Sequence, residues 1–315
     1  MAIDPGVVLP AAGPAAETST PNPTPPTRPA RPLRFVRRVF LLVGLSFVGF
    51  FASLYALQAN MIFPGSASQG RPEAVVRPGS GEELVKLPTA GGEVVALFGA
   101  AQGPDGGALA DAASRPALVF FYGNAMCLAY CGPLMDRFRR LGFNVVVPDY
   151  LGYGMSGGQP SEAGCRETAE ACYDFLRSRK IPASRILVGG WSLGGAVAID
   201  LASRKEVAGL FAFSTFTSVP DMARTVLPIA PPAVLFKHRF DSLSKVPNLT
   251  CPILLGHGRR DPIVPYSMFE RLRAAAKEPP SVLVLDRAEH NDFLDAGGSR
   301  LDRAILELAA KAGAR

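Results

Sequence analysis

Short apolar runs alternate with longer amphipathic stretches over most of the chain. ELVKL and EVVALF look like an opening pair of strands, and six short apolar runs, most of them ended by Gly, Pro or Asp, follow them: ALVFFY, FNVVVPDY, RILVGG, GLFAFS, PILLGHG and SVLVLD. Continuous apolar runs of this length are typical of strands that are covered on both faces. The stretches between them have helical spacing and read CGPLMDRFRRLG, EAGCRETAEACYDFLRSRK, GGAVAIDLASRK, YSMFERLRAAAK and RLDRAILELAAKA. This alternation predicts an α/β fold with a mostly parallel central sheet and helices on both faces.

An unbroken apolar stretch precedes this alternation. Residues 39–57 (VFLLVGLSFVGFFASLYAL) carry no charge, and as a helix these 19 residues would cover about 28 Å, close to the hydrocarbon thickness of a bilayer. A buried core helix would show a polar face, whereas this stretch shows only Ser46 and Ser53. A cleaved signal peptide has a shorter apolar region nearer the N-terminus. We therefore predict one transmembrane helix over residues 39–61.

The charges around this stretch predict its orientation. The cluster RFVRR lies just before it, and no Lys or Arg follows until Arg71. The positive-inside rule then places the N-terminus in the cytoplasm and the domain at residues 65–315 on the periplasmic or extracytoplasmic side. Residues 1–38 are rich in Pro, Ala and Thr, so we expect a disordered basic tail.

Charge and cysteine usage narrow the function classes. The net charge is +6, of which residues 1–38 hold +3, so the rest of the chain has no concentrated basic surface for nucleic acid. The five cysteines form no C-x-x-C pair and no Cys/His cluster with zinc spacing, and we predict neither a metal nor a cofactor. Their odd number leaves disulfide pairing open, and buried thiols are the favoured interpretation.

Three reactive side chains each follow a different predicted strand. Ser192 lies in the sequence GWSLGG, a G-x-S-x-G pattern that is typical of a strand-to-helix turn carrying a nucleophile. Asp261 follows PILLGHG, and His290 follows SVLVLD. Ligands of such sheets bind beyond the carboxyl ends of the strands, where these residues would meet. The order Ser, Asp, His is the one expected for an α/β-hydrolase.

An ordered set of longer motifs carries a family resemblance. They are QANMIFP at 58–64, YGNA at 122–125, DYLGYGMSGG at 149–158, GWSLGG at 190–195, HGRRDPIVP at 257–265 and EHND at 289–292. Over roughly residues 55–310 the chain resembles the membrane-anchored α/β-hydrolase domain family, neighbours of the serine aminopeptidase-like hydrolases, whose eukaryotic members include enzymes that remove acyl chains from proteins. The chain departs from the family pattern at Tyr122, where relatives have His. Together with the bulky Met126, this phenol would reshape an acyl pocket.

The chemistry assigns a role to each residue. Ser192 would attack an acyl carbonyl, His290 would accept its proton, and Asp261 would hold the imidazole tautomer. The backbone N–H groups of Leu193 and Asn124 would form the oxyanion hole.

Other candidates for these roles are weaker. Asp149 and Asp221 are rival acids, but the DYLGYG context of the first favours a loop-shaping role. Among the other histidines, His257 favours a structural hydrogen bond and His238 a place on the surface.

The segment 215–250 breaks the alternation and contains five prolines between Thr215 and Asn248, which makes it a candidate short cap over the site. Together these features predict a membrane-anchored serine hydrolase that cleaves carboxylic esters or thioesters of small-molecule or lipid-linked acyl substrates. Two alternatives stay open: a catalytically silent, membrane-tethered binding or scaffolding protein with the same fold, and a serine peptidase.

Overall fold

The computed structural model describes residues 1–2, 13, 31–227 and 232–314. Most of the predicted disordered tail at 1–38 lies outside these residues. The chain divides into two compact units, Met1–Gly49 and Phe50–Arg315. The second unit holds the sheet and is called the domain below.

Helix α1 (Arg31–Ile62) is the first regular element. Within the described part of the chain, one helix is long and apolar enough to cross a membrane, and it covers Leu33–Ile62 of α1. The helix begins earlier than the predicted span because the RFVRR cluster continues it, and arginine is a good helix former. It ends just before Phe63, whose backbone leaves the helical region ahead of Pro64.

Eight strands form one sheet in the order β1-β2-β4-β3-β5-β6-β7-β8. Their bounds are β1 (Glu82–Thr89), β2 (Gly92–Gly99), β3 (Ala117–Phe121), β4 (Asn144–Pro148), β5 (Ile186–Trp191), β6 (Gly209–Phe213), β7 (Ile253–Gly258) and β8 (Ser281–Leu285). The pairs β1–β2 and β2–β4 are antiparallel, and every other pair is parallel. The mostly parallel sheet predicted from the sequence is confirmed.

Helices cover both faces of this sheet. Their bounds are α2 (Gly132–Arg140), α3 (Glu162–Ser178), α4 (Leu193–Ala202), α5 (Val219–Val226), α6 (Ser242–Lys245), α7 (Tyr266–Ala275) and α8 (Phe293–Lys311). In the sheet, β4 lies on one side of β3 and β5 lies on the other. Helix α2 connects β3 to β4 and helix α3 connects β4 back to β5, so the two right-handed crossovers run in opposite directions and place α2 and α3 on opposite faces. Arg137 of α2 bonds Asp302 of α8 at 2.6 Å, which joins these two helices on one face.

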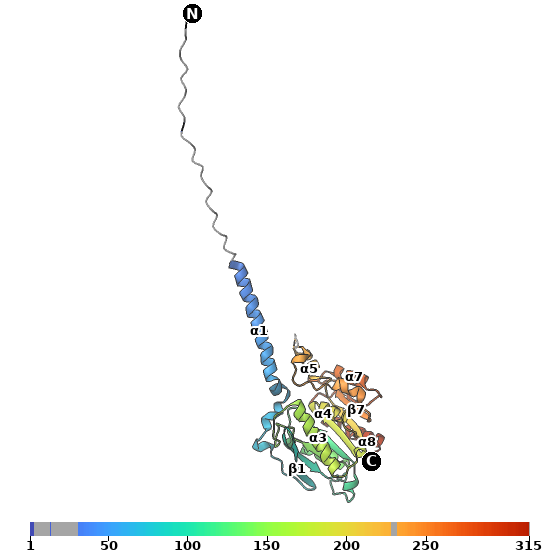
Figure 1. The fold of residues 1–315 in the computed structure, drawn as a ribbon. Coiled ribbons are helices and arrows are strands. Elements are labelled where there is room, and N and C mark those ends of the chain that lie inside the picture. The colour runs from blue at the N-terminus through green and yellow to red at the C-terminus, as the bar shows by residue number, and fades with distance from the viewer. Residues whose placement is uncertain (3–12, 14–30, 228–231, 315) are drawn as a thin grey trace. The chain divides into compact units, whose positions relative to one another are not determined.

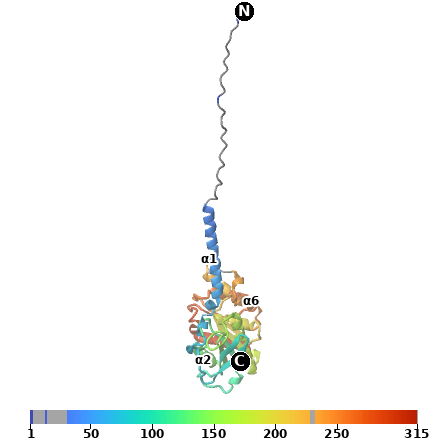
Figure 2. The ribbon, with the colours of Figure 1, turned by 60° about the vertical axis from the view of Figure 1, so that its left-hand side comes forward.

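The other face carries α3 and α4 side by side (Figure 1), and α4 contacts α6, which contacts α7. Figure 2 shows α2 and α6 on opposite flanks of the domain. With both faces covered, all residues of β3, β4 and β6 are buried, which explains their continuous apolar sequence.

Two helices differ from the sequence expectation. The last helix begins at Phe293, seven residues before the predicted stretch, and is kinked at Gly298, whose φ is +45°. Helix α5 lies within the segment 215–250, where prolines obscure the helical pattern. Pro220 is tolerated there because it occupies the first turn, and the Ser218 side chain caps that turn by accepting from the N–H of Asp221.

All five cysteines are free thiols, four of them buried: Cys127, Cys131, Cys165 and Cys172. The fifth, Cys251, is half-buried.

Candidate active site

Ser192 occupies a sharp turn between β5 and α4. Its φ of +56° and ψ of −120° lie in a region that residues with a side chain rarely adopt. Two hydrogen bonds hold this backbone, one from the end of β6 and one from the residues that follow it: the Ser192 N–H donates to the carbonyl of Phe213 at 2.8 Å, and the Thr215 hydroxyl donates to the Ser192 carbonyl at 2.8 Å. The turn therefore presents the serine side chain beyond the end of the sheet, as in a nucleophile elbow.

The glycines on either side of Ser192 are required by close packing. A Cβ at Gly190 would lie 2.1 Å from the carbonyl oxygen of Gly194, and a Cβ at Gly194 would lie 1.9 Å from the carbonyl oxygen of Phe121. Neither backbone atom can move without displacing a strand or the start of α4. The G-x-S-x-G spacing is thus explained by the steric demands of this turn.

The structure brings the three predicted reactive side chains together. His290 Nε2 lies 3.0 Å from the Oγ of Ser192, and His290 Nδ1 lies 2.7 Å from Oδ2 of Asp261. Ser192 follows β5, Asp261 follows β7 and His290 follows β8, so three strand ends supply one hydrogen-bonded chain. His290 is only 4% exposed, which keeps water away from most of the imidazole.

Asp261 is held as a carboxylate. Its Oδ1 accepts from the N–H groups of Val264 at 2.8 Å and Ile263 at 2.9 Å, while Oδ2 faces His290. Burial alone would raise the pKa of Asp261, but the hydrogen bond and the charge of His290, with the two backbone donors, outweigh burial and hold the pKa below its ordinary value. The negative charge next to the imidazole therefore persists at neutral pH.

Trp191 supports His290, a role that the sequence analysis did not assign. Its Nε1 donates to the His290 carbonyl at 3.2 Å, and the two rings lie 5.1 Å apart. A Cβ at Gly123 would lie 2.6 Å from the Trp191 ring, so the glycine of YGNA makes room for the indole. One feature of the sequence could have suggested this role: the only tryptophan of the chain lies directly before the reactive serine.

The two predicted oxyanion donors line the pocket that contains Ser192. Within the described residues, the N–H groups of Leu193 and Asn124 donate to no protein acceptor. The Asn124 loop is fixed by other atoms, because its carbonyl accepts from the Tyr153 hydroxyl at 2.9 Å and its side-chain Nδ2 donates to the Ile62 carbonyl at 3.0 Å. Both N–H groups are thus left for an oxygen placed in the pocket.

Asp149 is used elsewhere. It accepts from the Tyr122 hydroxyl at 2.9 Å, from the N–H of Leu128 at 2.7 Å and from the N–H of Met155 at 2.9 Å. It therefore joins two loops, as the sequence interpretation favoured. The Tyr122 phenol is fully buried in this network and does not line the serine pocket, whereas Met126 does. Of the two residues expected to reshape the pocket, only Met126 is in place to do so.

The remaining histidines and Asp221 also have other partners. His257 Nε2 donates to the Val264 carbonyl at 2.9 Å, which is the structural hydrogen bond expected for it. His238 is half-buried, and its Nδ1 accepts from the N–H of Glu162 at 3.3 Å, so it is less exposed than expected. Asp221 accepts from the Thr217 hydroxyl at 2.6 Å and pairs with arginines.

Apolar side chains from several segments surround the reactive serine. The pocket is lined by Met61, Ile62, Asn124, Ala125, Met126, Trp191, Ser192, Leu193, Phe216, Val219, Met222, Ile263, Val264, His290 and Asn291. The end of α1 and the segment 215–250 both contribute to this list. Among the described residues, no group of three or more His, Cys, Asp or Glu side chains is arranged to hold a metal ion.

Comparisons with known proteins agree with this architecture. Residues 116–232 match the family model described as the alpha/beta hydrolase fold. The chain is 32% identical over 242 residues to the protein bem46 of Schizosaccharomyces pombe, a match that covers 71% of this chain and 76% of the relative. It is 35% identical over 180 residues to an uncharacterized protein of Mycobacterium tuberculosis, covering 57% of this chain but only 64% of that protein's length. The chain belongs to the α/β-hydrolase family.

Solved structures show the same fold at lower sequence identity. The esterase Pf2001 of Pyrococcus furiosus superimposes with a TM-score of 0.59 at 18% identity, covering 75% of this chain and 97% of the esterase. The likeness is one of fold. The chain therefore has the α/β-hydrolase fold. This fold follows an N-terminal apolar helix that is long enough to span a membrane.

Proposed function

We propose that the protein is a membrane-anchored serine hydrolase that cleaves carboxylic esters or thioesters through an acyl-enzyme intermediate. One observation carries the proposal: the hydrogen-bonded chain from Ser192 Oγ to His290 Nε2 at 3.0 Å, and from His290 Nδ1 to Asp261 at 2.7 Å. An alcohol is a weak nucleophile at neutral pH and needs a base within hydrogen-bond reach. This arrangement supplies the base and the group that orients it.

The reaction would proceed in two halves. Ser192 Oγ attacks the acyl carbonyl carbon as His290 Nε2 accepts the hydroxyl proton, and the electron pair of the C=O bond moves to the oxygen. The N–H groups of Leu193 and Asn124 stabilise that oxyanion. When it collapses, the leaving alcohol or thiol takes the proton from His290 and the acyl chain stays on Ser192. Water then repeats these steps and releases a carboxylic acid.

The surroundings favour an ester or thioester over a peptide. The pocket is mostly apolar, and its polar side chains are those of the reactive centre with Asn124 and Asn291. A peptide substrate would bring backbone N–H and C=O groups that need partners along its length. An acyl chain brings none. The catalytically silent alternative would not need a serine held at a positive φ beside a buried histidine.

Active-site labelling tests the proposal. We expect a fluorophosphonate probe to label the full-length protein in phosphatidylcholine vesicles, and Ser192→Ala to abolish labelling. Ser178→Ala, an exposed serine on α3, is the matched control and should label like the parent protein. Labelling of Ser192→Ala at the parent rate would place the nucleophile elsewhere, and no labelling of the folded parent protein would favour the scaffolding alternative. Faster turnover of peptide anilides than of esters or thioesters would favour the peptidase.

A further inference from the structure

A second groove adjoins the serine pocket. Its walls are formed by residues between 51 and 62 of α1, by residues between 219 and 227 at α5, and by Leu235 and Phe236. This space is called the α1–α5 groove below. Four residues line both spaces: Met61, Ile62, Val219 and Met222. The groove therefore continues from the pocket that holds Ser192.

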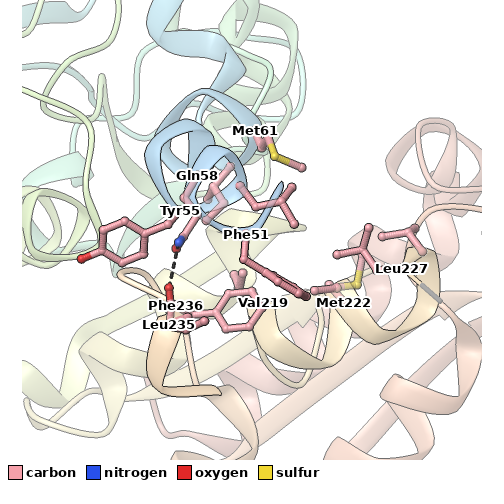
Figure 3. Close-up of a pocket in the computed structure, with 13 residues that line it drawn as sticks. Phe51, Tyr55, Gln58, Met61, Val219, Met222, Leu227, Leu235 and Phe236 are labelled. Atoms are coloured by element: carbon pink, nitrogen blue, oxygen red, sulfur yellow. Dashed lines mark hydrogen bonds between the residues drawn. The ribbon is translucent and has the colours of Figure 1, made fainter. Parts of the chain in front are cut away.

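One face of each helix forms the walls. From α1 the lining residues are Phe51, Leu54, Tyr55, Gln58, Met61 and Ile62. They recur every three or four residues, which is the spacing of a single helix face. From α5 and the residue after it they are Val219, Met222, Ala223, Val226 and Leu227, with the same spacing. Figure 3 shows Phe51 and Met222 facing the same space from the two helices.

The walls offer almost nothing polar to an occupant. Among the described lining residues, only Tyr55 and Gln58 carry a side-chain nitrogen or oxygen. Both ends of the Gln58 amide are used: Nε2 donates to the Leu235 carbonyl at 2.8 Å and Oε1 accepts from the N–H of Lys237 at 2.8 Å. At the same time, Met61 is 61% exposed and Val226 is 75% exposed. Exposed apolar side chains that converge on one groove indicate an apolar ligand.

The α1 wall also belongs to the candidate membrane span, which covers Leu33–Ile62. A hydrocarbon chain in a bilayer meets such a helix without crossing water. A chain lying along α1 toward Ile62 would reach residues that also line the pocket of Ser192. If α1 spans a bilayer, as its length and composition allow, one helix leads from the lipid to residues of the pocket that holds the reactive serine.

We infer that the α1–α5 groove binds the acyl chain of the substrate while its carbonyl carbon lies at Ser192. The inference rests on the proposed function and names its substrate class: esters or thioesters of long-chain fatty acids, drawn from a lipid surface. It also makes the last turns of the membrane helix part of the substrate site.

The test compares two probes that differ only in chain length. Butyl and hexadecyl fluorophosphonates are reacted with the full-length protein in phosphatidylcholine vesicles, and the second-order rate constants for labelling Ser192 are measured. We expect the hexadecyl probe to react faster. Partitioning into the vesicles contributes to that difference, so the decisive quantity is how the ratio of the two rate constants changes between variants under identical conditions.

Ala223→Phe fills the groove from α5. We expect it to lower the ratio of hexadecyl to butyl rate constants at least tenfold, since losing two buried methylenes already costs about fifteenfold in binding. Thr225→Phe adds a similar ring at an exposed position of α5 that does not line the groove, and should leave the ratio unchanged. Melting temperatures of both variants report whether the fold is kept. If Ala223→Phe does not fold, Ala223→Leu replaces it.

Each outcome separates this inference from the proposed function. If neither probe labels Ser192, the proposed hydrolase function fails and the groove inference falls with it. If both probes label Ser192 but the ratio is the same in the parent protein, Ala223→Phe and Thr225→Phe, the hydrolase proposal stands and the groove inference is overturned. An equal loss for both probes in Ala223→Phe would also overturn the inference, because the ring would then disturb the reactive centre rather than the chain site.

Discussion

Gln58 of α1 donates its side-chain Nε2 to the backbone carbonyl of Leu235, 177 residues further along the chain, at 2.8 Å (Figure 3). Its Oε1 accepts from the N–H of Lys237 at 2.8 Å, so one side chain joins the end of α1 to the connection between α5 and α6. Gln58 is 9% exposed, which makes these bonds harder for water to replace. This contact explains why a glutamine lies on the face of α1 that otherwise presents mostly apolar side chains to the groove.

Replacing Gln58 should loosen that connection. Gln58→Leu keeps the size of the side chain and removes both hydrogen bonds, each worth about 1 kcal/mol. We expect the amide hydrogen of Lys237 to exchange about fivefold faster, measured by hydrogen exchange and mass spectrometry or NMR. The Phe240 amide, which donates to Glu162 at 2.9 Å, is the internal control and should keep its protection. Unchanged exchange at Lys237 would show that packing alone holds this segment.

The second prediction concerns the acid. Asp261→Asn should lower turnover of an ester by about 10³–10⁴ while the protein stays folded, because the amide would favour the wrong imidazole tautomer. Asp286→Asn, an exposed carboxylate after β8, is the control and should keep the parent rate. If Asp149→Asn abolishes turnover in a folded protein while Asp261→Asn does not, the acid is Asp149.

The third prediction is a pH dependence of stability. Burial lowers the pKa of His257, and the nearby His290 lowers it further. The hydrogen bond to the Val264 carbonyl and the charge of Asp261 raise this pKa, but they do not outweigh burial. His257 is fully buried, and its Nδ1 has no hydrogen-bond partner among the described residues. Since the folded-state pKa lies below the unfolded value of about 6.5, the unfolded chain takes up the proton first on acidification. Stability from this group is thus present above about pH 6.5 and declines as the pH falls through it.

Urea unfolding in one detergent at pH 7.5 and at pH 5.5 measures this effect. We expect the free energy of unfolding to fall toward pH 5.5, by up to about 1.4 kcal/mol per pH unit from a single histidine. His257→Gln should flatten the dependence, whatever its effect on stability at pH 7.5. His238 contributes in the same direction, because burial lowers its pKa too, so His238→Gln is the parallel variant. A slope that His257→Gln leaves intact would contradict the assignment.

The fourth prediction concerns the membrane. We propose that residues 39–61 anchor the protein with its N-terminus in the cytoplasm, since the RFVRR cluster precedes the span and the next basic residue is Arg71. The full-length protein should stay with membranes through a carbonate wash, and protease added from outside the cytoplasmic membrane should cleave within residues 65–315. A soluble cytoplasmic protein should remain protected in the same sample. Release by carbonate would indicate peripheral attachment, and protection of residues 65–315 would reverse the orientation.

Local patterns were sufficient for most of the fold. All eight strands fall on the stretches predicted from the sequence. Strands buried on both faces, such as β3 and β6, are apolar along their whole length, whereas the edge strand β1 mixes exposed with partly buried residues. The hydrophobic pattern did not predict helices in two places where its helical period is interrupted. Helix α5 contains Pro220 in its first turn, and the kink at Gly298 divides α8, so neither segment shows an uninterrupted helical repeat.

For the candidate site, chain order could predict which residues meet but not what supports them. Ser192, Asp261 and His290 follow three parallel strands, so their approach could be expected from topology. The support that Trp191 provides to His290 could not, since it arises from one rotamer and one backbone carbonyl. The direction of Tyr122 was likewise undetermined, because its hydroxyl could equally have faced the pocket or Asp149.

The sequence by itself determined the α/β class, the apolar helix and the order of the reactive residues, because each depends on local periodicity or on position along the chain. Only the tertiary structure decided what the lining face of α1 packs against. Ser53 and Asn60 lie on the side of the helix opposite the lining residues, but this pattern contains no information about which segment of the domain forms the facing wall. That choice depends on α5 and on Gln58, contacts between segments more than 150 residues apart in the chain.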